Sequence, residues 1–452
     1  MATGSLGRAG MVGSDSYSLS FFSCARTPLA YMAGKPVALG QFRADVEALL
    51  SQFDRDGDTL ITCPGRYGLG IALLASLISN KTVILPPNNL DQTLTKIRQR
   101  FNVGFECNVS WASSLLNEHS ATEHGSWDVQ LTPGANTIKL FTSGSSGDPK
   151  VVTKSVANLF DEAYILASMF DWPAGAIVGS VPVQHAYGLT FSLLLPWALG
   201  QPWVDEIPHF PGDIYHVISK TQAKTLISVP AQYQAMLEDC TELRNIFCVT
   251  AAAPLQEDLA RQWELRNGVH LLEIYGSTET GVVAHRQQVA TKLWQAFPQV
   301  GLSVEEGRLK VDSPFVSKAF HNGFLTADRV SLLNRRQFAL LERIGTTIKI
   351  AGKRVSLTEV ELTVNALPGV LEAAVFAVPA KGPVRDFAIW AVVVPTGEQD
   401  ISPRQLQAAL RDKLQGVEVP RRILVVDKLP RSMSGKLPRD ALIRLFDEHD
   451  AT

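Results

Sequence analysis

The stretch Phe141-Thr142-Ser143-Gly144-Ser145-Ser146-Gly147-Asp148-Pro149-Lys150 decides the fold of this chain. It directly follows the end of a predicted strand, residues 138–141. Its two glycines permit positive φ, and consecutive backbone N–H groups in such a turn can hold an anion. It is not a Walker A motif, because Pro149 stands where the second glycine belongs. The stretch predicts a nucleotide phosphate loop, although a Ser/Gly-rich loop by itself is also typical of a plain surface turn.

Around this loop, short apolar runs alternate with helical patterns. The runs that read as buried strands are 59–62, 82–85, 177–181, 225–229, 246–250 and 270–274. Helical patterns cover residues 68–79 and 256–267. Strands that alternate with helices indicate an α/β fold with mostly parallel sheets flanked by helices. Ligands usually bind at the carboxyl ends of such strands.

The pattern changes after about residue 342. Residues 371–378, 387–394 and 422–426 read as strands, and residues 438–446 read as a helix. Another helix begins at Ser402, which can cap it, with Pro403 at the first helical position and Gln405 completing a capping box. These elements predict a small α+β domain of about a hundred residues. The chain therefore divides into a large N-terminal domain and a small C-terminal one.

Bulk composition excludes several classes of function. The 452 residues carry a net charge of −2, so a sequence-independent hold on nucleic acid or on an anionic membrane is not expected. The five cysteines form no CxxC pair, which favours neither a zinc site nor a disulfide framework. Apolar runs are too short to span a bilayer and no clear signal peptide is present, so we expect a cytoplasmic protein without stable membrane insertion.

Polar segments follow the later strands in an informative order. Residues 275–280, Tyr-Gly-Ser-Thr-Glu-Thr, follow a predicted strand that ends at Ile274. An aromatic ring, a hydroxyl and a carboxylate there suit adenine stacking, phosphate contact and Mg²⁺ ligation, although a turn with a helix cap fits as well. Asp328, Arg343 and a closing Ser434-Gly435-Lys436 segment follow.

Together and in this order, these segments resemble the adenylate-forming superfamily, which contains acyl- and aryl-CoA synthetases, luciferases and the adenylation domains of peptide synthetases. The resemblance extends from about Ile138 to the C-terminus, whereas the upstream part is shorter than in typical members. It implies ATP and Mg²⁺ as cofactors, and a small domain that moves between two half-reactions.

The resemblance also implies roles for individual residues. Lys436 would bridge the substrate carboxylate and the α-phosphate, Thr278 would contact the α-phosphate, and Glu279 would ligate Mg²⁺. His185 would help to gate the acid pocket, although a lone histidine is more often structural. The nucleotide would lie against a larger set: Thr142, Ser143, Gly144, Ser145, Ser146, Gly147, Lys150, Ala252, Ala253, Tyr275, Gly276, Thr278, Asp328 and Arg343.

The sequence departs from the family at the hinge. After Arg343 the family usually has x-Asp-Asp or x-Asp-Lys, whereas this chain has Ile344-Gly345-Thr346. Gly345 would accept the φ/ψ change of domain rotation, and Gly352 and Lys353 would line the thiol tunnel. We accordingly expect residues 1–16 to be a disordered tail, residues 17–342 the nucleotide- and acid-binding domain, and residues 343–452 the mobile domain.

The acid and its acceptor are less constrained. The expected pocket mixes small and aromatic residues, which suits an aryl acid or a medium acyl chain: His185, Tyr187, Gly188, Val229, Tyr233, Ala251 and Ile274. The chain looks similar to stand-alone ligases of aryl polyene and xanthomonadin-type pigment clusters, which load hydroxybenzoate-type acids onto acyl carrier protein.

Several alternatives stay open. CoA is an alternative acceptor to acyl carrier protein. A non-catalytic acyl- or nucleotide-binding relative and a luciferase-like oxidative enzyme are alternatives of other classes. A basic run in residues 420–440 would suit an acidic carrier protein, although it also fits an ordinary solvated face.

Overall fold

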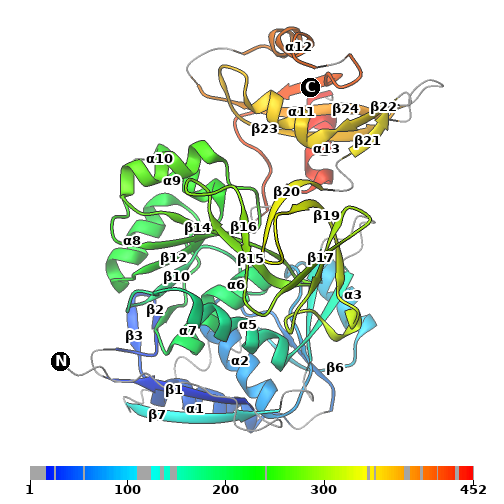
Figure 1. Ribbon diagram of the computed structural model, residues 1–452. Coiled ribbons are helices and arrows are strands. Elements are labelled where there is room, and N and C mark those ends of the chain that lie inside the picture. Colours follow the sequence, from blue (N-terminus) through cyan, green and yellow to red (C-terminus); the bar gives the residue numbers. More distant parts are fainter. Residues whose placement is uncertain are drawn as a thin grey trace. The chain divides into compact units, whose positions relative to one another are not determined.

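The computed structural model describes residues 17–24, 27–53, 56–108, 124–132, 137–142, 150–239, 242–343, 347–350, 353–380, 387–397, 401–414, 416–432 and 437–450 (Figure 1). The chain divides into two compact units. The first unit contains residues up to 303 together with 310–324 and 334–337, and the second contains 304–309, 325–333 and 338 onward. No helix in the described part of the chain has the length and apolarity that a bilayer crossing requires.

A mixed sheet with a parallel centre organises the first unit. The strands of this sheet that lie wholly in the first unit are, in spatial order, β16 (Trp294–Ala296), β15 (Gly281–Gln287), β14 (Leu271–Ser277), β13 (Phe247–Thr250), β12 (Thr225–Ser228), β10 (Ile177–Gly179), β11 (Trp203–Val204), β2 (Ala30–Met32) and β3 (Lys35–Val37). Pairing is parallel from β14 to β2 and antiparallel at both ends. The carboxyl ends of β10, β12, β13 and β14 therefore share one edge.

Three helices cover one face of these strands: α8 (Pro211–Thr221), α9 (Pro230–Glu238) and α10 (Glu257–Asn267) (Figure 1). Each helix contributes buried apolar side chains to one core cluster, among them Ile214, Met236 and Trp263. The strands contribute Leu226 and Cys248 to the same cluster. Burial of this apolar face fixes the register of the strands, since a one-residue shift would turn these side chains away from the helices.

A second, smaller sheet carries the loop predicted to bind phosphate. Its spatial order is β6 (Val103–Cys107), β4 (Asp58–Ile61), β5 (Val83–Ile84), β8 (Thr137–Thr142) and β9 (Lys150–Ser155). The helices of this half of the unit are α1 (Leu39–Leu50), α2 (Arg66–Ile78), α3 (Asp91–Arg100), α5 (Val156–Met169), α6 (Ala186–Leu189), the π-helix η1 (Thr190–Leu194) and α7 (Leu195–Leu199). Helix α2 is buried along nearly all of its length, which is typical of a helix that is apolar all round.

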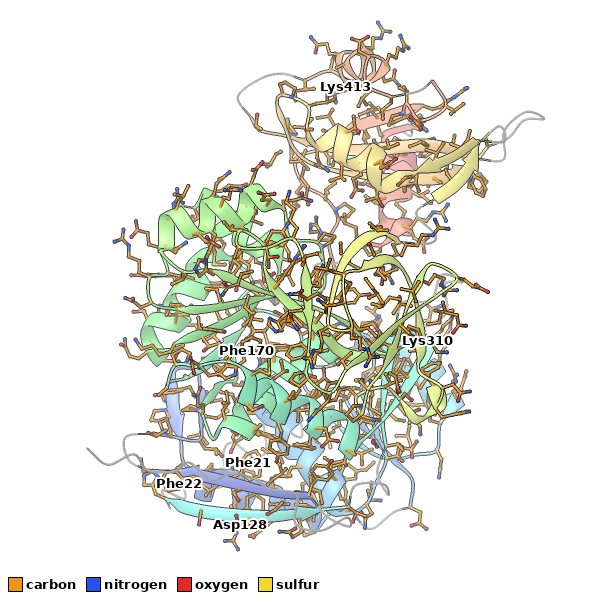
Figure 2. The ribbon with its side chains drawn as sticks, viewed as in Figure 1. Phe21, Phe22, Asp128, Phe170, Lys310 and Lys413 are labelled. Carbon is orange, nitrogen blue, oxygen red and sulfur yellow. The ribbon has the colours of Figure 1, made fainter. Side chains whose placement is uncertain are left out.

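A two-stranded antiparallel ribbon, β1 (Tyr17–Ser23) with β7 (Gly125–Leu131), completes the first unit. Figure 2 labels Phe21, Phe22 and Asp128 on this ribbon. Phe21 is buried among aromatic rings, whereas its neighbour Phe22 is 46% exposed. This alternation is the period-two pattern of a ribbon with one face on the core.

Further elements follow β16 along the chain: β17 (Gly301–Glu305), β18 (Arg308–Asp312), the 3-10 helix η2 (Lys318–Phe320), β19 (Phe324–Leu332) and β20 (Gln337–Arg343). Strands β19 and β20 form an antiparallel hairpin, in which Asp328 is the register partner of Arg343.

The remaining elements of the second unit are β21 (Thr347–Ile350), β22 (Lys353–Ser356), α11 (Leu357–Asn365), β23 (Val370–Pro379), β24 (Phe387–Pro395), α12 (Pro403–Arg411), β25 (Arg422–Val425) and α13 (Arg439–Asp450). Sheet β23-β24-β25 has a core on each face. On β24, Ile389 and Val393 join the cluster of α11 and α12, whereas Val392 and Val394 join the cluster of α13. The unit thus has its own apolar core.

These observations confirm the predicted fold class, a large N-terminal α/β unit with a small α+β unit after it. The expected strands and helices are present with shifts of a few residues at their ends, and the Ser402–Gln405 capping box is formed. Strand β14 continues through Ser277 instead of ending at Ile274. Several elements were not predicted, among them the N-terminal strands β1, β2 and β3, the strands β7, β9 and β15, and helix α5.

Candidate active site

The site lies where four strands of the large sheet end together. Strands β10, β12 and β13 run parallel in register, with Gly179 opposite Ile227 and Ser228 opposite Thr250. Strand β14 continues the same arrangement, with Glu273 opposite Thr250. The segments that follow these ends include most of the residues predicted to hold adenine and the acid. The topology therefore gathers at one sheet edge residues that are far apart in the sequence.

The segment after β10 turns into α6, whose N-cap is His185. The Tyr187 hydroxyl donates to the backbone oxygen of Ser228 at 2.9 Å and to that of Val249 at 3.2 Å. Burial raises the pKa of Tyr187 well above its usual value, so the hydroxyl keeps its proton and remains a donor. At Gly188 an added Cβ would lie 2.1 Å from the Pro182 oxygen, so only glycine fits this turn.

A polar group lies between the ends of β10 and β12. The Ser228 hydroxyl donates to Gln232 Oε1 at 2.7 Å, and the Ser180 hydroxyl lies 2.7 Å from Ser228 Oγ and in contact with the same Gln232 oxygen. Val229 is buried beside them. Tyr233, in contrast, is fully buried in the core of the α9 and α10 layer, where its ring packs on Trp263 and its hydroxyl donates to backbone carbonyls.

The segment after β13 contains an unusual backbone position. Ala252 has φ +72°, in the left-handed region that costs a non-glycine residue roughly 1 kcal/mol. The next turn is anchored, because the Leu255 N–H donates to Glu273 Oε1 at 3.1 Å and Arg286 Nε contacts Glu273 Oε2 at 2.6 Å. Ala251 is buried, whereas Ala252 is exposed and Ala253 half-buried. The strained Ala252 is therefore exposed to solvent, next to a turn that the contacts of Glu273 hold in place.

Strand β14 ends in a tight hairpin with β15. Pairing shifts between Tyr275 and Gly276, and an added Cβ at Gly276 would lie 2.3 Å from the Gly281 oxygen. Reciprocal hydrogen bonds between Ser277 and Thr280 hold the turn, from the Ser277 N–H to Thr280 Oγ1 at 3.0 Å and from the Thr280 N–H to Ser277 Oγ at 3.2 Å. Residues 278 and 279 are therefore fixed at the tip, with half-exposed side chains.

Aromatic rings pack together at the base of this hairpin. The Tyr275 ring lies 5.5 Å from the Trp294 ring at an interplanar angle of 54°, and the Arg286 guanidinium lies 4.3 Å from the same Trp294 ring. Ile274, one residue earlier, is buried in the sheet. Tyr275 itself is half-buried. An aromatic ring is a suitable partner for a planar ligand.

The predicted phosphate loop is described only at its two ends. Thr142 closes β8 and Lys150 opens β9, and the two are antiparallel register partners. Residues 143–149 lie outside the described residues, as do Gly345, Gly352 and Lys436. Lys353 is the register partner of Ile350 in the hairpin β21–β22.

Asp328 and Arg343 come together in the second unit. Their backbones are paired across β19 and β20, and Arg343 Nε lies 3.8 Å from Asp328 Oδ1. The carboxylate is largely buried while the guanidinium is mostly exposed, with side-chain exposures of 15% and 68%. Such a pair can offer a ligand one acceptor and several donors side by side.

Arg66 is a residue that sequence reasoning missed. It is completely buried at the start of α2, and its guanidinium donates to the Gly179, Val181 and Glu206 oxygens at 2.6, 3.1 and 2.7 Å. Burial lowers its pKa to about 10. The side chain therefore joins the segments at the ends of β10 and β11. Its signal in the sequence was a single charge opening an otherwise apolar helix.

The sequence matches known protein families and known proteins over most of its length. Residues 73–314 match the AMP-binding enzyme family, and residues 359–436 match the AMP-binding enzyme C-terminal domain. The human mitochondrial acyl-coenzyme A synthetase ACSM2A is 26% identical over 425 residues, which cover 83% of this chain and 72% of that protein.

Two further proteins extend the comparison. The p-hydroxybenzoic acid–AMP ligase FadD22 of Mycobacterium tuberculosis is 27% identical over 383 residues, which cover 77% of this chain and 54% of that protein. The structure of o-succinylbenzoate CoA synthetase (MenE) from Bacillus subtilis, in complex with the acyl-adenylate intermediate OSB-AMP, superposes with a TM-score of 0.75 at 21% identity. It covers 92% of this chain and 96% of that chain, which shows a shared fold.

Proposed function

The chain belongs to the AMP-binding enzymes, and from that premise we propose that it activates an aryl acid such as a hydroxybenzoate and transfers it to the phosphopantetheine thiol of an acyl carrier protein. The underlying activity is that of an adenylate-forming acid–thiol ligase that uses ATP. The observation that carries the proposal is the sheet edge at which the Tyr187 segment, Ala252 and the Thr278–Glu279 hairpin are gathered.

We assign the nucleotide to this edge. Tyr275 and the Ala252–Ala253 backbone would hold adenine between them, because a half-buried ring and a fixed, exposed turn suit a flat base. Thr278 would contact the α-phosphate, and residues 142–150 would hold the β- and γ-phosphates. The acceptor and donors of Asp328 and Arg343 suit the two ribose hydroxyls.

Glu279 fits a magnesium ion that is shared with the nucleotide. In the described residues no group of three or more His, Cys, Asp or Glu side chains gathers as a complete protein metal site. Mg²⁺ is commonly held by one or two carboxylates together with substrate phosphates, so one half-exposed carboxylate at a fixed hairpin tip is a suitable donor set. When bound, the ion would neutralise phosphate charge.

The chemistry needs little covalent help from the protein. A carboxylate oxygen of the acid attacks the α-phosphorus, an O–P bond forms, and the bond to the bridging oxygen breaks as pyrophosphate leaves with the electron pair. The thiol sulfur then attacks the acyl carbon, its proton passes to solvent, and AMP leaves with the C–O electrons. Because both partners of the first step are anionic, we assign Lys436 to hold the carboxylate against the α-phosphate.

We infer an aryl acid with a polar substituent from the residues at these strand ends. Tyr187 and Gly188 bring an aromatic side chain and a close turn to the ends of β12 and β13, and Ser228 and Gln232 add polar groups nearby. A pocket that mixes apolar walls with a few hydrogen-bonding groups distinguishes hydroxylated from plain ring acids. The name of the Mycobacterium tuberculosis relative, a p-hydroxybenzoic acid–AMP ligase, agrees with this choice.

The acceptor is the less supported half of the proposal. Among the basic residues of 420–440, Arg422 already contacts Asp450 at 2.5 Å and Arg439 donates to a backbone oxygen. Arg421 and Lys428 are exposed and remain suitable for an acidic carrier protein. CoA remains the alternative acceptor, and the name of the human relative points to it. A cytoplasmic location, where ATP and thiols coexist, completes the proposal.

One experiment tests the substrate and the acceptor together. Acid-dependent ATP–pyrophosphate exchange is measured over a panel of hydroxybenzoates, plain benzoates and straight-chain acids. Thioester formation is then measured with CoA and with holo acyl carrier protein. Preferred exchange with hydroxybenzoates and faster loading of the carrier support the proposal. Preference for straight-chain acids would contradict an aryl acid as the substrate. Efficient transfer to CoA alone would contradict the carrier protein as the acceptor.

A further inference from the structure

Three polar side chains at four-residue spacing form a buried row behind the hairpin that carries Thr278 and Glu279. Lys154 lies near the end of β9, and Asn158 and Glu162 lie on successive turns of α5. Their exposures are 1%, 5% and 5%. Residues four apart on a helix share one face, so α5 directs its polar row into the protein interior. We call Lys154, Asn158 and Glu162 the buried ladder.

Lys154 provides the first contact of the ladder. Its ammonium donates to the backbone oxygen of Glu279 at 3.0 Å and to that of Phe315 at 2.5 Å. The Glu279 oxygen also lies within 3.4 Å of the Ser317 N–H. A buried ammonium strongly favours such partners, because an uncompensated charge in the interior is costly. The backbone carbonyl of the proposed metal-binding residue is thus held by a buried cation.

Asn158 and Glu162 continue this pattern on neighbouring backbone segments. The Asn158 amide donates to the Pro314 oxygen at 2.6 Å and to the Val316 oxygen at 3.1 Å. Glu162 Oε1 accepts the Val282 N–H at 2.9 Å, and the same carboxylate is hydrogen-bonded by Thr190. The ladder therefore holds residues 279–282, residues 314–316 and the start of η1 at the same time.

Gly281 shows how closely the hairpin approaches the ladder. It has φ +68°, and an added Cβ would lie 2.8 Å from Phe315 Cβ and 3.1 Å from Glu162 Oε2. A side chain at residue 281 would not fit in this space, and the hydrogen bonds to the ladder oppose movement of the hairpin away from α5. Thr278 and Glu279 are consequently fixed relative to β9, the strand that leaves the predicted phosphate loop at Lys150.

We propose that the buried ladder is a positioning device for MgATP, in which Lys154 sets the Thr278–Glu279 hairpin against the strand that leaves the phosphate loop. This inference rests on the proposed function, because it uses the assignment of Glu279 to magnesium. Groups that orient a ligating residue commonly change metal affinity by about 10- to 100-fold when they are removed. Lys154 is therefore a positioning residue and not a catalytic one.

The test compares Lys154→Met with the wild-type protein in nucleotide binding. Methionine keeps an unbranched side chain of nearly the same length but removes both hydrogen bonds to Glu279 and Phe315. Isothermal titration calorimetry with a non-hydrolysable ATP analogue is run in Mg²⁺ and in EDTA. We expect Lys154→Met to lose about tenfold in affinity in Mg²⁺ and to stay within about twofold in EDTA.

The control variant is Asp45→Asn, which alters another fully buried polar residue. Asp45 lies on α1 and accepts the Tyr67 hydroxyl at 2.7 Å, so its loss measures the general effect of disturbing a buried hydrogen bond. Its ratio of Mg²⁺ to EDTA affinity should equal that of the wild type. An unchanged ratio in Lys154→Met, or an equal change in Asp45→Asn, overturns the proposal.

Two further outcomes are separable. If circular dichroism shows that Lys154→Met does not fold, the ratio of Mg²⁺ to EDTA affinity is measured for Asn158→Ala instead. If neither variant folds, the ladder serves stability alone and the proposal is overturned. Wild-type pyrophosphate exchange is measured in parallel. If no acid gives pyrophosphate exchange, the proposed function is wrong. The ratio of Mg²⁺ to EDTA affinity still decides the role of Lys154 in that case.

Discussion

Arg343 Nε lies 3.8 Å from Asp328 Oδ1, across a register pair of β19 and β20. A ligand hydroxyl can donate to the carboxylate, and the guanidinium can donate to a second ligand oxygen. We predict that Asp328→Ala weakens ATP binding about tenfold or more, because it removes a charged acceptor of the ribose. Measured KM values for ATP and for 2′,3′-dideoxy-ATP check the prediction.

The two nucleotides separate a direct contact from a general effect. Asp328→Ala should bind both with similar weakness, whereas the wild type should prefer ATP. Asp312→Asn, which alters an exposed carboxylate on β18, should behave like the wild type. A persistent preference for ATP in Asp328→Ala would show that the carboxylate does not contact the ribose.

Lys436→Ala should separate the two half-reactions. Removal of one preorganised cation at the reacting phosphate is expected to lower acid-dependent pyrophosphate exchange by roughly a hundredfold to a thousandfold. Thioester formation from supplied acyl-AMP should change by less than about threefold. Normal exchange in this variant would show that another residue bridges the acid and the α-phosphate. Lys413→Ala, which removes an exposed lysine of the same unit outside residues 420–440, is the matched control.

Tyr187→Phe should affect the acid more than the nucleotide. The change removes the hydroxyl that donates to the Ser228 and Val249 oxygens, so the aromatic ring is no longer fixed at the ends of β12 and β13. We expect the KM for the acid to rise about three- to tenfold, consistent with the loss of one hydrogen bond, while the KM for ATP changes less than twofold. Equal changes in both constants would indicate a general loss of packing.

The buried carboxyl of Glu162 should make stability depend on pH. Burial raises its pKa from 4.5 to about 7 despite the nearby charge of Lys154. Between these two values the folded state binds a proton that the unfolded state releases, so this stabilisation is full below pH 4.5 and is lost as the pH rises to about 7. The expected loss is on the order of 1–3 kcal/mol.

The measurement uses denaturant unfolding of the wild type and of Glu162→Gln at pH 5, 6, 7 and 8. Glutamine keeps an acceptor for the Val282 N–H but does not titrate. The difference in unfolding free energy between the two proteins should move in favour of the variant from pH 5 to pH 7 and then become constant. A difference that does not depend on pH would show that Glu162 titrates normally.

Much of the fold could be predicted because apolar runs and helix signals are local. Residues 225–229 and 246–250 are short apolar runs bounded by polar residues, and they form β12 and β13 with small shifts. The continuation of β14 through Ser277 was not predictable from local pattern. It depends on the close approach of Gly276 to Gly281, which only the paired strand reveals.

Some residues of the candidate site could likewise be predicted from the sequence, and others could not. Gly188 and Tyr275 belong to motifs that can be read directly, whereas Lys154, Asn158 and Arg66 act through contacts with distant backbone. Lys154 lies 125 positions from Glu279 and 161 from Phe315. A lysine in a strand is normally expected to face solvent, and nothing in its own neighbourhood indicates these partners. Such residues become visible only when the topology is known.

The hydrogen bonds of Arg66 bear on how the acid preference of such an enzyme can change in evolution. Its guanidinium contacts backbone oxygens at Gly179, Val181 and Glu206, and a backbone oxygen is present whatever the side chain. Substitutions at Val181 or Glu206 therefore leave the anchoring contacts intact. The acid pocket that we propose at these strand ends could therefore change its side chains toward other acids without loss of this anchor.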